Sequence, residues 1–231
     1  MCKAVAKEKT TMTNAENELK LFLVDPNSHL CIAFEQYFEG LPNVEVANTL
    51  FEQLPEFDCM VSPANSFGLM DGGVDAAIIS YFGHDLMRRV QEHILDKYLG
   101  EQSVGTSFII ETGNDKHPYL AHTPTMRVPM DITRTDNVYR AMWAMLLAVR
   151  AHNQAIERPI RSIACPGLGT GTGKVPFKEA ARQMALAYRN FFNCPKYITW
   201  TYADARQLAV RYGGDFGFHV PPEGSRDSST F

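Results

Sequence analysis

Short apolar runs alternate along the chain with longer segments in which apolar residues recur at helical spacing. The runs are short enough for buried strands, and they predict strands at 19–24, 58–62, 104–110, 118–122, 161–165 and 196–202, with a weaker one near 43–47. The periodic segments predict helices at 28–39, at 74–98 with a break near Gly83, from Asp136 to about Val149, at 176–192 and at 203–211. Strands alternating with helices predict an α/β fold, a three-layer αβα sandwich around a mixed, mostly parallel sheet.

The two ends of the chain lack this pattern. Residues 1–18 are polar and aperiodic, which predicts a flexible N-terminal arm. Residues 213–231 are rich in Gly, Pro and Ser, which predicts a flexible tail. No repeat or linker interrupts residues 19–212, so we expect one domain there, large enough to bury a substantial core.

Composition narrows the classes of partner. Among 231 residues the net charge is −4, so no basic excess is present to neutralise an extended nucleic-acid tract. No apolar run approaches the roughly 20 residues that cross a bilayer, and the N-terminus lacks the apolar core of a secretory signal, so no membrane partner is expected. Five cysteines without a CxxC pair favour a reducing compartment, the cytoplasm or, as an alternative, the nucleus. The histidines show no metal-ligand spacing, so we expect no metal and no cofactor.

The stretch VSPANSFGLMDGGVDAAI, residues 61–78, joins a predicted strand to a predicted helix. Gly72 and Gly73 fall just before the helix, where free backbone N–H groups and the helix dipole attract anions. Glycines also let a phosphate come close to the amides. The stretch therefore predicts an anion-binding turn, with an ordinary strand-to-helix turn as the alternative.

A second glycine-rich stretch, ACPGLGTGTGKVPF at 164–177, also joins a strand to a helix. It is no P-loop, which would need glycine in place of Leu168 and a hydroxyl in place of Val175, and no GxGxxG register fits. Alternating Gly and Thr still offer amides and hydroxyls suited to a pyrophosphate, although a flexible connection is the alternative. Because ligands bind beyond the carboxyl ends of strands, the two turns can hold one ligand from opposite sides.

These stretches carry a resemblance to a known family. VSPANSFGLMDGGVDAAI resembles the first ligand loop of macrodomains, commonly NAANSxLxGGGGVDxAI, and ACPGLGTGTGKVPFKEAARQMALAY resembles their second loop. YLAHTPTMRVPMDI and TDNVYRAMWAMLLAV resemble the region between, so the similarity covers most of residues 45–200. Macrodomains are αβα sandwiches that bind ADP-ribose, and some remove it from modified proteins or remove its terminal phosphate. The resemblance thus implies ADP-ribose or an ADP-ribosylated protein as partner.

The resemblance also implies roles for single residues. Asn65 would face the distal ribose, and Asp75, ten residues later, falls where hydrolytic members place a carboxylate that can orient or activate water. Tyr202, at the end of the last predicted strand, would stack on the adenine. The phosphate would lie between two sets of residues: Gly72, Gly73 and Val74 on one side, and Gly169, Thr170, Gly171, Thr172 and Gly173 on the other.

Each of these side chains has a structural alternative. Asn65 can stabilise the turn through its own side chain, and Asp75 is favourable in a first helical turn without any catalysis. Tyr202 can be a tyrosine of the core.

The chain also departs from the family pattern. Met70 and Asp71 replace two of the four glycines, and the adenine contact falls near Asn48 or Thr49. The second loop lacks the aromatic residue that hydrolytic members often carry. That absence favours a reader, whereas the retained spacing from Asn65 to Asp75 favours an enzyme, and we expect ADP-ribose binding with metal-independent hydrolysis of mono-ADP-ribose from proteins. A non-catalytic reader and an ADP-ribose 1″-phosphate phosphatase stay open as alternatives.

Overall fold

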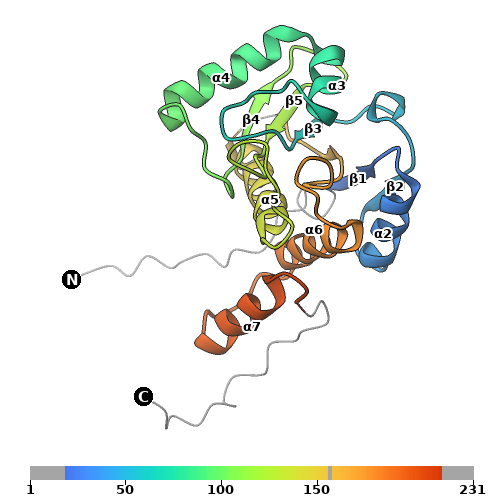
Figure 1. The fold of residues 1–231 in the computed structure, drawn as a ribbon, viewed down its shortest axis with the longest axis vertical. Coiled ribbons are helices and arrows are strands. Elements are labelled where there is room, and N and C mark those ends of the chain that lie inside the picture. The colour runs from blue at the N-terminus through green and yellow to red at the C-terminus, as the bar shows by residue number, and fades with distance from the viewer. Residues whose placement is uncertain (1–18, 156–157, 215–231) are drawn as a thin grey trace, which may run out of the picture.

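The computed structural model describes residues 19–155 and 158–214, and within them six strands form one sheet in the order β2-β1-β6-β3-β5-β4 (Figure 1). The strands are β1 (Lys20–Val24), β2 (Val44–Ala47), β3 (Cys59–Ser62), β4 (Phe108–Glu111), β5 (Tyr119–His122) and β6 (Ser162–Cys165). Every neighbouring pair is parallel except β4 with β5, which is antiparallel. The prediction of a mixed, mostly parallel sheet is confirmed.

Side chains alternate between the two faces of the sheet, and each face packs against its own helices. In β1, Leu21 and Leu23 face one core while Phe22 and Val24 face the other. The first core lies under α2 (Ser28–Phe38), α5 (Asn137–Ala155) and α6 (Phe177–Phe192). The second lies under α3 (Gly73–Phe82), α4 (His84–Tyr98) and the short 3-10 helix η1 (Phe51–Gln53). Figure 1 shows these two helical layers on opposite sides of the sheet, which confirms the αβα sandwich.

The predicted helices form, and their boundaries have local causes. Asn27 caps α2 by accepting a hydrogen bond from the His29 amide. Gly83, with φ of 96°, separates α3 from α4 at the predicted break. α6 follows directly after Pro176, whose fixed φ suits the start of a helix.

The strand predicted at 196–202 is wrong. The helix α7 (Trp200–Val210) begins inside that segment, and the Thr199 side chain caps it by accepting from the Tyr202 amide. β6 pairs with β1 on one side and β3 on the other, so the sheet has no free position beside β6 for a later strand. The strand predicted at 104–110 is also shifted: β4 begins at Phe108, since Gly105 has φ of 90°.

The buried guanidinium of Arg182, which is ion-paired within α6, fastens α7 to α6. Arg182 donates to both carboxylate oxygens of Glu179, at 2.8 and 2.7 Å. The same guanidinium donates to the carbonyl oxygens of Ala209 and Arg211, at 2.8 and 3.0 Å. One side chain of α6 thereby holds the end of α7.

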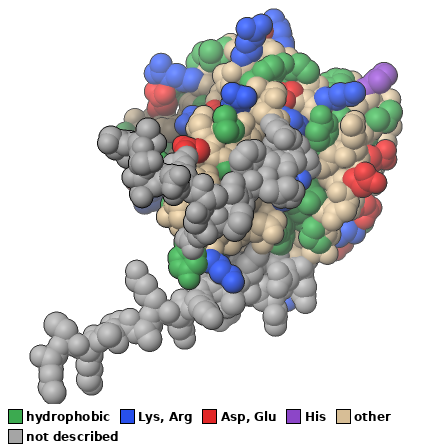
Figure 2. Space-filling model, turned by 90° about the horizontal axis from the view of Figure 1, so that it is seen from below, with side chains coloured by type: hydrophobic (Ala, Val, Ile, Leu, Met, Phe, Trp, Pro, Cys, Tyr) green, Lys and Arg blue, Asp and Glu red, His purple; other side chains and the backbone are tan. Residues whose placement is uncertain are grey.

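The predicted arm at residues 1–18 lies outside the described residues, as does the predicted tail except for Gly213 and Gly214. On the face seen in Figure 2, basic and acidic side chains are interspersed. None of the helices in the described part of the chain is long and apolar enough to cross a bilayer.

Candidate functional site

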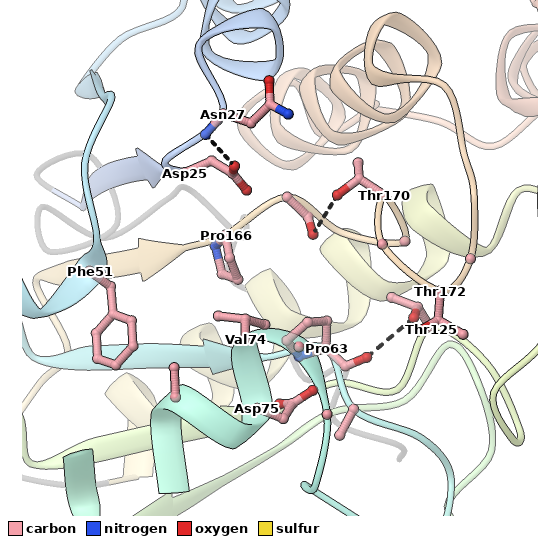
Figure 3. A pocket seen from close by; sticks show the side chains of 18 of the residues that line it. Asp25, Asn27, Phe51, Pro63, Val74, Asp75, Thr125, Pro166, Thr170 and Thr172 are labelled. Atoms are coloured by element: carbon pink, nitrogen blue, oxygen red, sulfur yellow. Dashed lines mark hydrogen bonds between the residues drawn. The ribbon is translucent and has the colours of Figure 1, made fainter. Parts of the chain in front are cut away.

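A cavity of about 550 Å³ lies at the edge of the sheet where the parallel strands end (Figure 3). Its wall includes residues that directly follow three strands, Asp25 after β1, Pro63 after β3 and Pro166 after β6. Thr125, which follows β5 within the next turn of the chain, also lines it. Both predicted glycine turns also line it. The volume lies within the range of roughly 300–1,000 Å³ that is usual for small-molecule sites.

The first glycine turn opens the N-terminus of α3 to this cavity. Gly72 precedes the helix without any side-chain cap, and Gly73 has φ of 56°. A Cβ atom added to either glycine would meet no atom within 4 Å. The amides at the start of α3, including that of Val74, are therefore accessible from the cavity and lie at the positive end of the helix dipole.

In the second turn, tightly packed glycines alternate with an open one. A Cβ on Gly173 would lie 2.6 Å from the Gly169 carbonyl oxygen, and a Cβ on Gly169, whose φ is 69°, would lie 2.9 Å from Val138. A Cβ on Gly171 would meet no atom within 4 Å. The outer two glycines therefore fix the shape of the turn, and the middle one faces open space.

The amides of this second turn are available to a ligand. The turn closes on itself where Lys174 N–H donates to the Gly171 oxygen and Val175 N–H donates to the Gly169 oxygen, both at 3.0 Å. The amides of Thr170, Gly171 and Thr172 donate to none of the other residues in the described ranges. A row of free N–H groups can bind an anionic oxygen.

The structure brings together nearly all the residues predicted for the site. Those that line the cavity are Asn65, Gly72, Gly73, Val74, Asp75, Gly169, Thr170, Gly171, Thr172 and Gly173. Tyr202 does not line it: the residue sits on α7, and its hydroxyl accepts from Arg206. Its predicted position depended on the strand at 196–202, which does not form.

Asp75 is a buried carboxyl in the first turn of α3, and it also lines the cavity. Its Oδ1 accepts a hydrogen bond of 2.6 Å from the hydroxyl of Ser62 at the end of β3. Burial raises the pKa of Asp75 to about 7, although the Ser62 hydrogen bond acts in the opposite direction. Near neutral pH this carboxyl therefore exists in both protonation states, which suits a group that exchanges a proton.

The Asn65 side chain stabilises its own turn. Its Oδ1 accepts from the amides of Phe67 and Leu69, at 3.0 and 3.3 Å, and its Nδ2 donates to the Leu69 oxygen at 2.8 Å. The structural alternative considered for Asn65 is thus present. A carboxamide has two donor hydrogens, so one remains for a ligand in the cavity.

The charged side chains that line the cavity are carboxylates: Asp25, Glu52, Asp71 and Asp75. No Lys, Arg or His occurs among the described lining residues. Lys174 follows the second turn, but its ammonium lies 4.0 Å from Asp131 at the surface. An anionic ligand would therefore be held by backbone amides.

The described residues include no group of three or more His, Cys, Asp or Glu side chains that could hold a metal ion.

At the end of the cavity beside β1 and β2, sequence reasoning named Asn48 and Thr49, of which Thr49 lines the cavity, but it missed Asp25 and Phe51. Asp25 lies there with Oδ1 accepting from the Asn27 amide at 2.9 Å, and Asn48 donates to the Asp25 carbonyl at 3.0 Å. Phe51 lines the same end and packs edge-on against Tyr81, with ring centroids 5.6 Å apart. The available signal was the polar sequence DPNS directly after the first predicted strand.

Comparisons with known proteins agree with this geometry. The family model described as Macro domain matches residues 61–184. An uncharacterized protein of Aquifex aeolicus is 34% identical over 134 residues, which cover 58% of this chain and 74% of that protein. A macro domain-containing protein of Listeria monocytogenes is 31% identical over 133 residues, covering 57% and 70%.

Solved structures show the same fold at lower identity. The macrodomain of Mycobacterium tuberculosis DarG has a TM-score of 0.51 at 17% identity, covering 62% of this chain and 88% of that one. A mutant Oceanobacillus iheyensis macrodomain with ADPR has a TM-score of 0.51 at 22% identity, covering 59% and 72%. The family match spans more than half of the chain and includes both glycine turns, so the protein belongs to the macrodomain family.

Proposed function

We propose that this protein binds ADP-ribose, free or attached to protein, and hydrolyses mono-ADP-ribose from modified proteins. The observation that carries the proposal is that two glycine turns with free amides line one cavity, with the buried carboxyl of Asp75 beside them. An Oceanobacillus iheyensis macrodomain of similar fold, solved with ADPR, supports the choice of ligand.

The diphosphate would lie between the two turns. The N-terminus of α3 offers amides at Gly73 and Val74 from one side, and the second turn offers those of Thr170 to Thr172 from the other. Backbone donors can satisfy phosphate oxygens without a basic side chain, which matches a cavity lined by carboxylates.

The two ends of the cavity differ in character, and this supports one direction for the ligand. Phe51, Leu30 and Pro26 give the end beside β1 and β2 an apolar, partly aromatic wall suited to a nucleobase. Thr125 lies on the side of the cavity away from Phe51 (Figure 3), and Asn65 is bridged to Met126, the neighbour of Thr125. Together with Asp75 in the first turn of α3, they offer amide, hydroxyl and carboxyl groups that suit the hydroxyls of a ribose. The distal ribose would therefore lie at the Asn65 end.

Hydrolysis would use Asp75 in its ionised form. The carboxylate accepts a proton from a water molecule, and the water oxygen bonds to the anomeric carbon of the distal ribose. The bond from that carbon to the acceptor side chain breaks, and its electron pair leaves with the acceptor, which takes up the proton. The products are ADP-ribose and unmodified protein.

A non-catalytic reader is the second candidate. It is favoured by Asn65, whose amide is largely used within its own turn, and by Thr172 in a turn where hydrolytic members often carry an aromatic residue. It differs from the first proposal only in turnover, so one experiment decides between them.

That experiment measures ADP-ribose binding by calorimetry and release of label from a mono-ADP-ribosylated acceptor, with ADP-ribose 1″-phosphate as a second substrate. We expect binding, and release that Asp75→Asn abolishes while Asp71→Asn, an exposed carboxylate of the same turn, retains it. Binding without turnover of either substrate would identify a non-catalytic reader. Turnover of ADP-ribose 1″-phosphate alone would identify a phosphatase. Absence of binding contradicts the whole proposal.

A further inference from the structure

Three exposed apolar side chains lie in the two chain segments that contact Asn65, around Leu69 and after Met126. Leu69, Val128 and Met130, which we call the apolar rim, are 49%, 46% and 49% exposed. Leu69 also lines the cavity, as does Pro129, the residue between the other two. The apolar rim is thus continuous with the cavity wall.

Backbone hydrogen bonds fix the apolar rim to the ligand turns. Leu69 is held through its main chain by the Asn65 side chain. The Ser66 amide lies 3.1 and 3.2 Å from the carbonyl oxygens of Met126 and Arg127. Farther along, Ile132 N–H donates to the Gly173 oxygen at 3.0 Å. The segment 126–132 therefore connects both turns, and its exposed side chains keep a set position relative to the cavity.

Two ion pairs lie beside the apolar rim. Arg127 donates to both carboxylate oxygens of Glu101, at 2.7 and 2.8 Å, and Lys174 lies 4.0 Å from Asp131. An anionic partner such as nucleic acid would find no unpaired cation in these two pairs. Exposed apolar side chains gathered around a binding site indicate contact with another apolar surface.

The orientation proposed for ADP-ribose in the cavity indicates which partner would cover the apolar rim. If the nucleobase lies at the Phe51 end and the diphosphate between the turns, the distal ribose ends beside Asn65. Any group attached to that ribose leaves the cavity next to the apolar rim. A free nucleotide would make no use of Val128 and Met130, which do not line the cavity, whereas a polypeptide attached to the ribose would cover them.

We propose that the apolar rim docks the polypeptide that carries the ADP-ribose, by contact with apolar side chains flanking the modified residue. This inference rests on the proposed function and specifies its substrate as protein-linked. It separates two kinds of contact: the cavity holds the nucleotide, and the rim selects the polypeptide.

The test uses the full chain and a synthetic peptide that carries mono-ADP-ribose through a linkage that cannot be hydrolysed, with Leu and Val on either side of the modified residue. Dissociation constants for this peptide and for free ADP-ribose are measured for the wild type and for the double variant Val128→Ser/Met130→Ser. The control ligand is the same peptide with Ser at both flanking positions. The control variant is Leu95→Ser/Leu208→Ser, which changes exposed apolar residues on α4 and α7.

We expect the wild type to bind the apolar-flanked peptide about five- to tenfold more tightly than free ADP-ribose or the Ser-flanked peptide. The rim variant should lose that advantage and keep its affinity for free ADP-ribose, while the control variant should behave as wild type. Equal peptide affinity in wild type and rim variant overturns the inference, as does a rim variant that weakens both ligands alike. Failure of the wild type to bind free ADP-ribose overturns the proposed function itself, so the two failures are distinguishable.

Discussion

At the scale of single residues, the burial of Asp75 destabilises the fold when its carboxyl is ionised. Its pKa is raised from 3.8 to about 7, so the folded state binds the proton more tightly than the unfolded state. Protonation of Asp75 therefore stabilises the folded state. This contribution to the free energy of unfolding is fully present below pH 3.8 and is lost as the pH rises through 7.

Asp75→Asn removes this dependence, because the amide stays neutral. We expect the variant to gain free energy of unfolding relative to wild type, with a gain at pH 8 that exceeds the gain at pH 5 by on the order of 2–3 kcal/mol. Urea unfolding at the two pH values measures it. Asp71→Asn, exposed on the same turn, should change the free energy by less than about 0.5 kcal/mol. An equal gain for Asp75→Asn at both pH values would show that burial does not raise this pKa.

Sequence reasoning located the residues of the site better than it assigned their roles. Gly72, Gly73 and Asp75 could be placed because each has a fixed offset from a strand-to-helix junction. The turn-stabilising hydrogen bonds of Asn65 were one of two alternatives, and the sequence could not choose between them because the same carboxamide can bond its own turn or a ligand. Asp25 and Phe51 reach the cavity through the order of strands in the sheet, a property of the whole fold.

At the scale of elements, the second turn contains two glycines with opposite constraints. Gly171→Ala places a methyl group in open space, so the free energy of unfolding should change little while the methyl obstructs the amides. Gly173→Ala forces a Cβ to within 2.6 Å of the Gly169 oxygen, and we expect it to lower the free energy of unfolding by about 1–3 kcal/mol.

Thermal unfolding and ADP-ribose titration of both variants check this contrast. Gly171→Ala should keep its melting temperature and bind about tenfold more weakly, the equivalent of one lost charge-assisted hydrogen bond. Unchanged affinity in Gly171→Ala would indicate that the diphosphate does not use this turn.

The attachment of α7 depends on the buried guanidinium of Arg182. Arg182→Met leaves the Glu179 carboxylate buried without its partner and removes the donors to the carbonyls of Ala209 and Arg211. We expect a loss of about 3–5 kcal/mol in the free energy of unfolding, measured by urea titration. The double variant Arg182→Met/Glu179→Met should recover much of this loss, because it leaves no unpaired charge. No recovery would mean that the carbonyl contacts contribute more than the ion pair.

The segment from Lys196 to Tyr202 shows why some elements could not be predicted. Its β-branched and aromatic residues favour a strand locally. However, β6, the strand that precedes this segment along the chain, already pairs with β1 on one side and β3 on the other, so the segment cannot pair with it. The buried strands β1, β3, β5 and β6 were predictable because each is a short apolar run bounded by polar or turn residues. Which strands lie side by side depends on pairings distant in sequence, so that order could not be inferred from the runs.

At the scale of the molecule, the net charge of −4 and the acidic cavity lining make an unusual site for a diphosphate. Backbone amides act at short range, whereas the carboxylates repel the ligand at longer range, where salt screens them. We therefore expect the dissociation constant for ADP-ribose to stay constant or decrease by up to about threefold between 50 and 500 mM NaCl. Calorimetry at both salt concentrations measures this. A tenfold weakening would instead indicate that cationic side chains hold the phosphates.

The central position of β1 has a consequence for how the protein matures. β1 is translated long before its partner β6, with which it pairs through Leu21 and Ile163. Until then one side of β1 has no strand to bond, and the apolar side chains of both its faces lack most of their cover. The sheet of the nascent protein therefore stays open at its centre until β6 has been translated, an interval in which a chaperone or a wrong strand can compete for that edge.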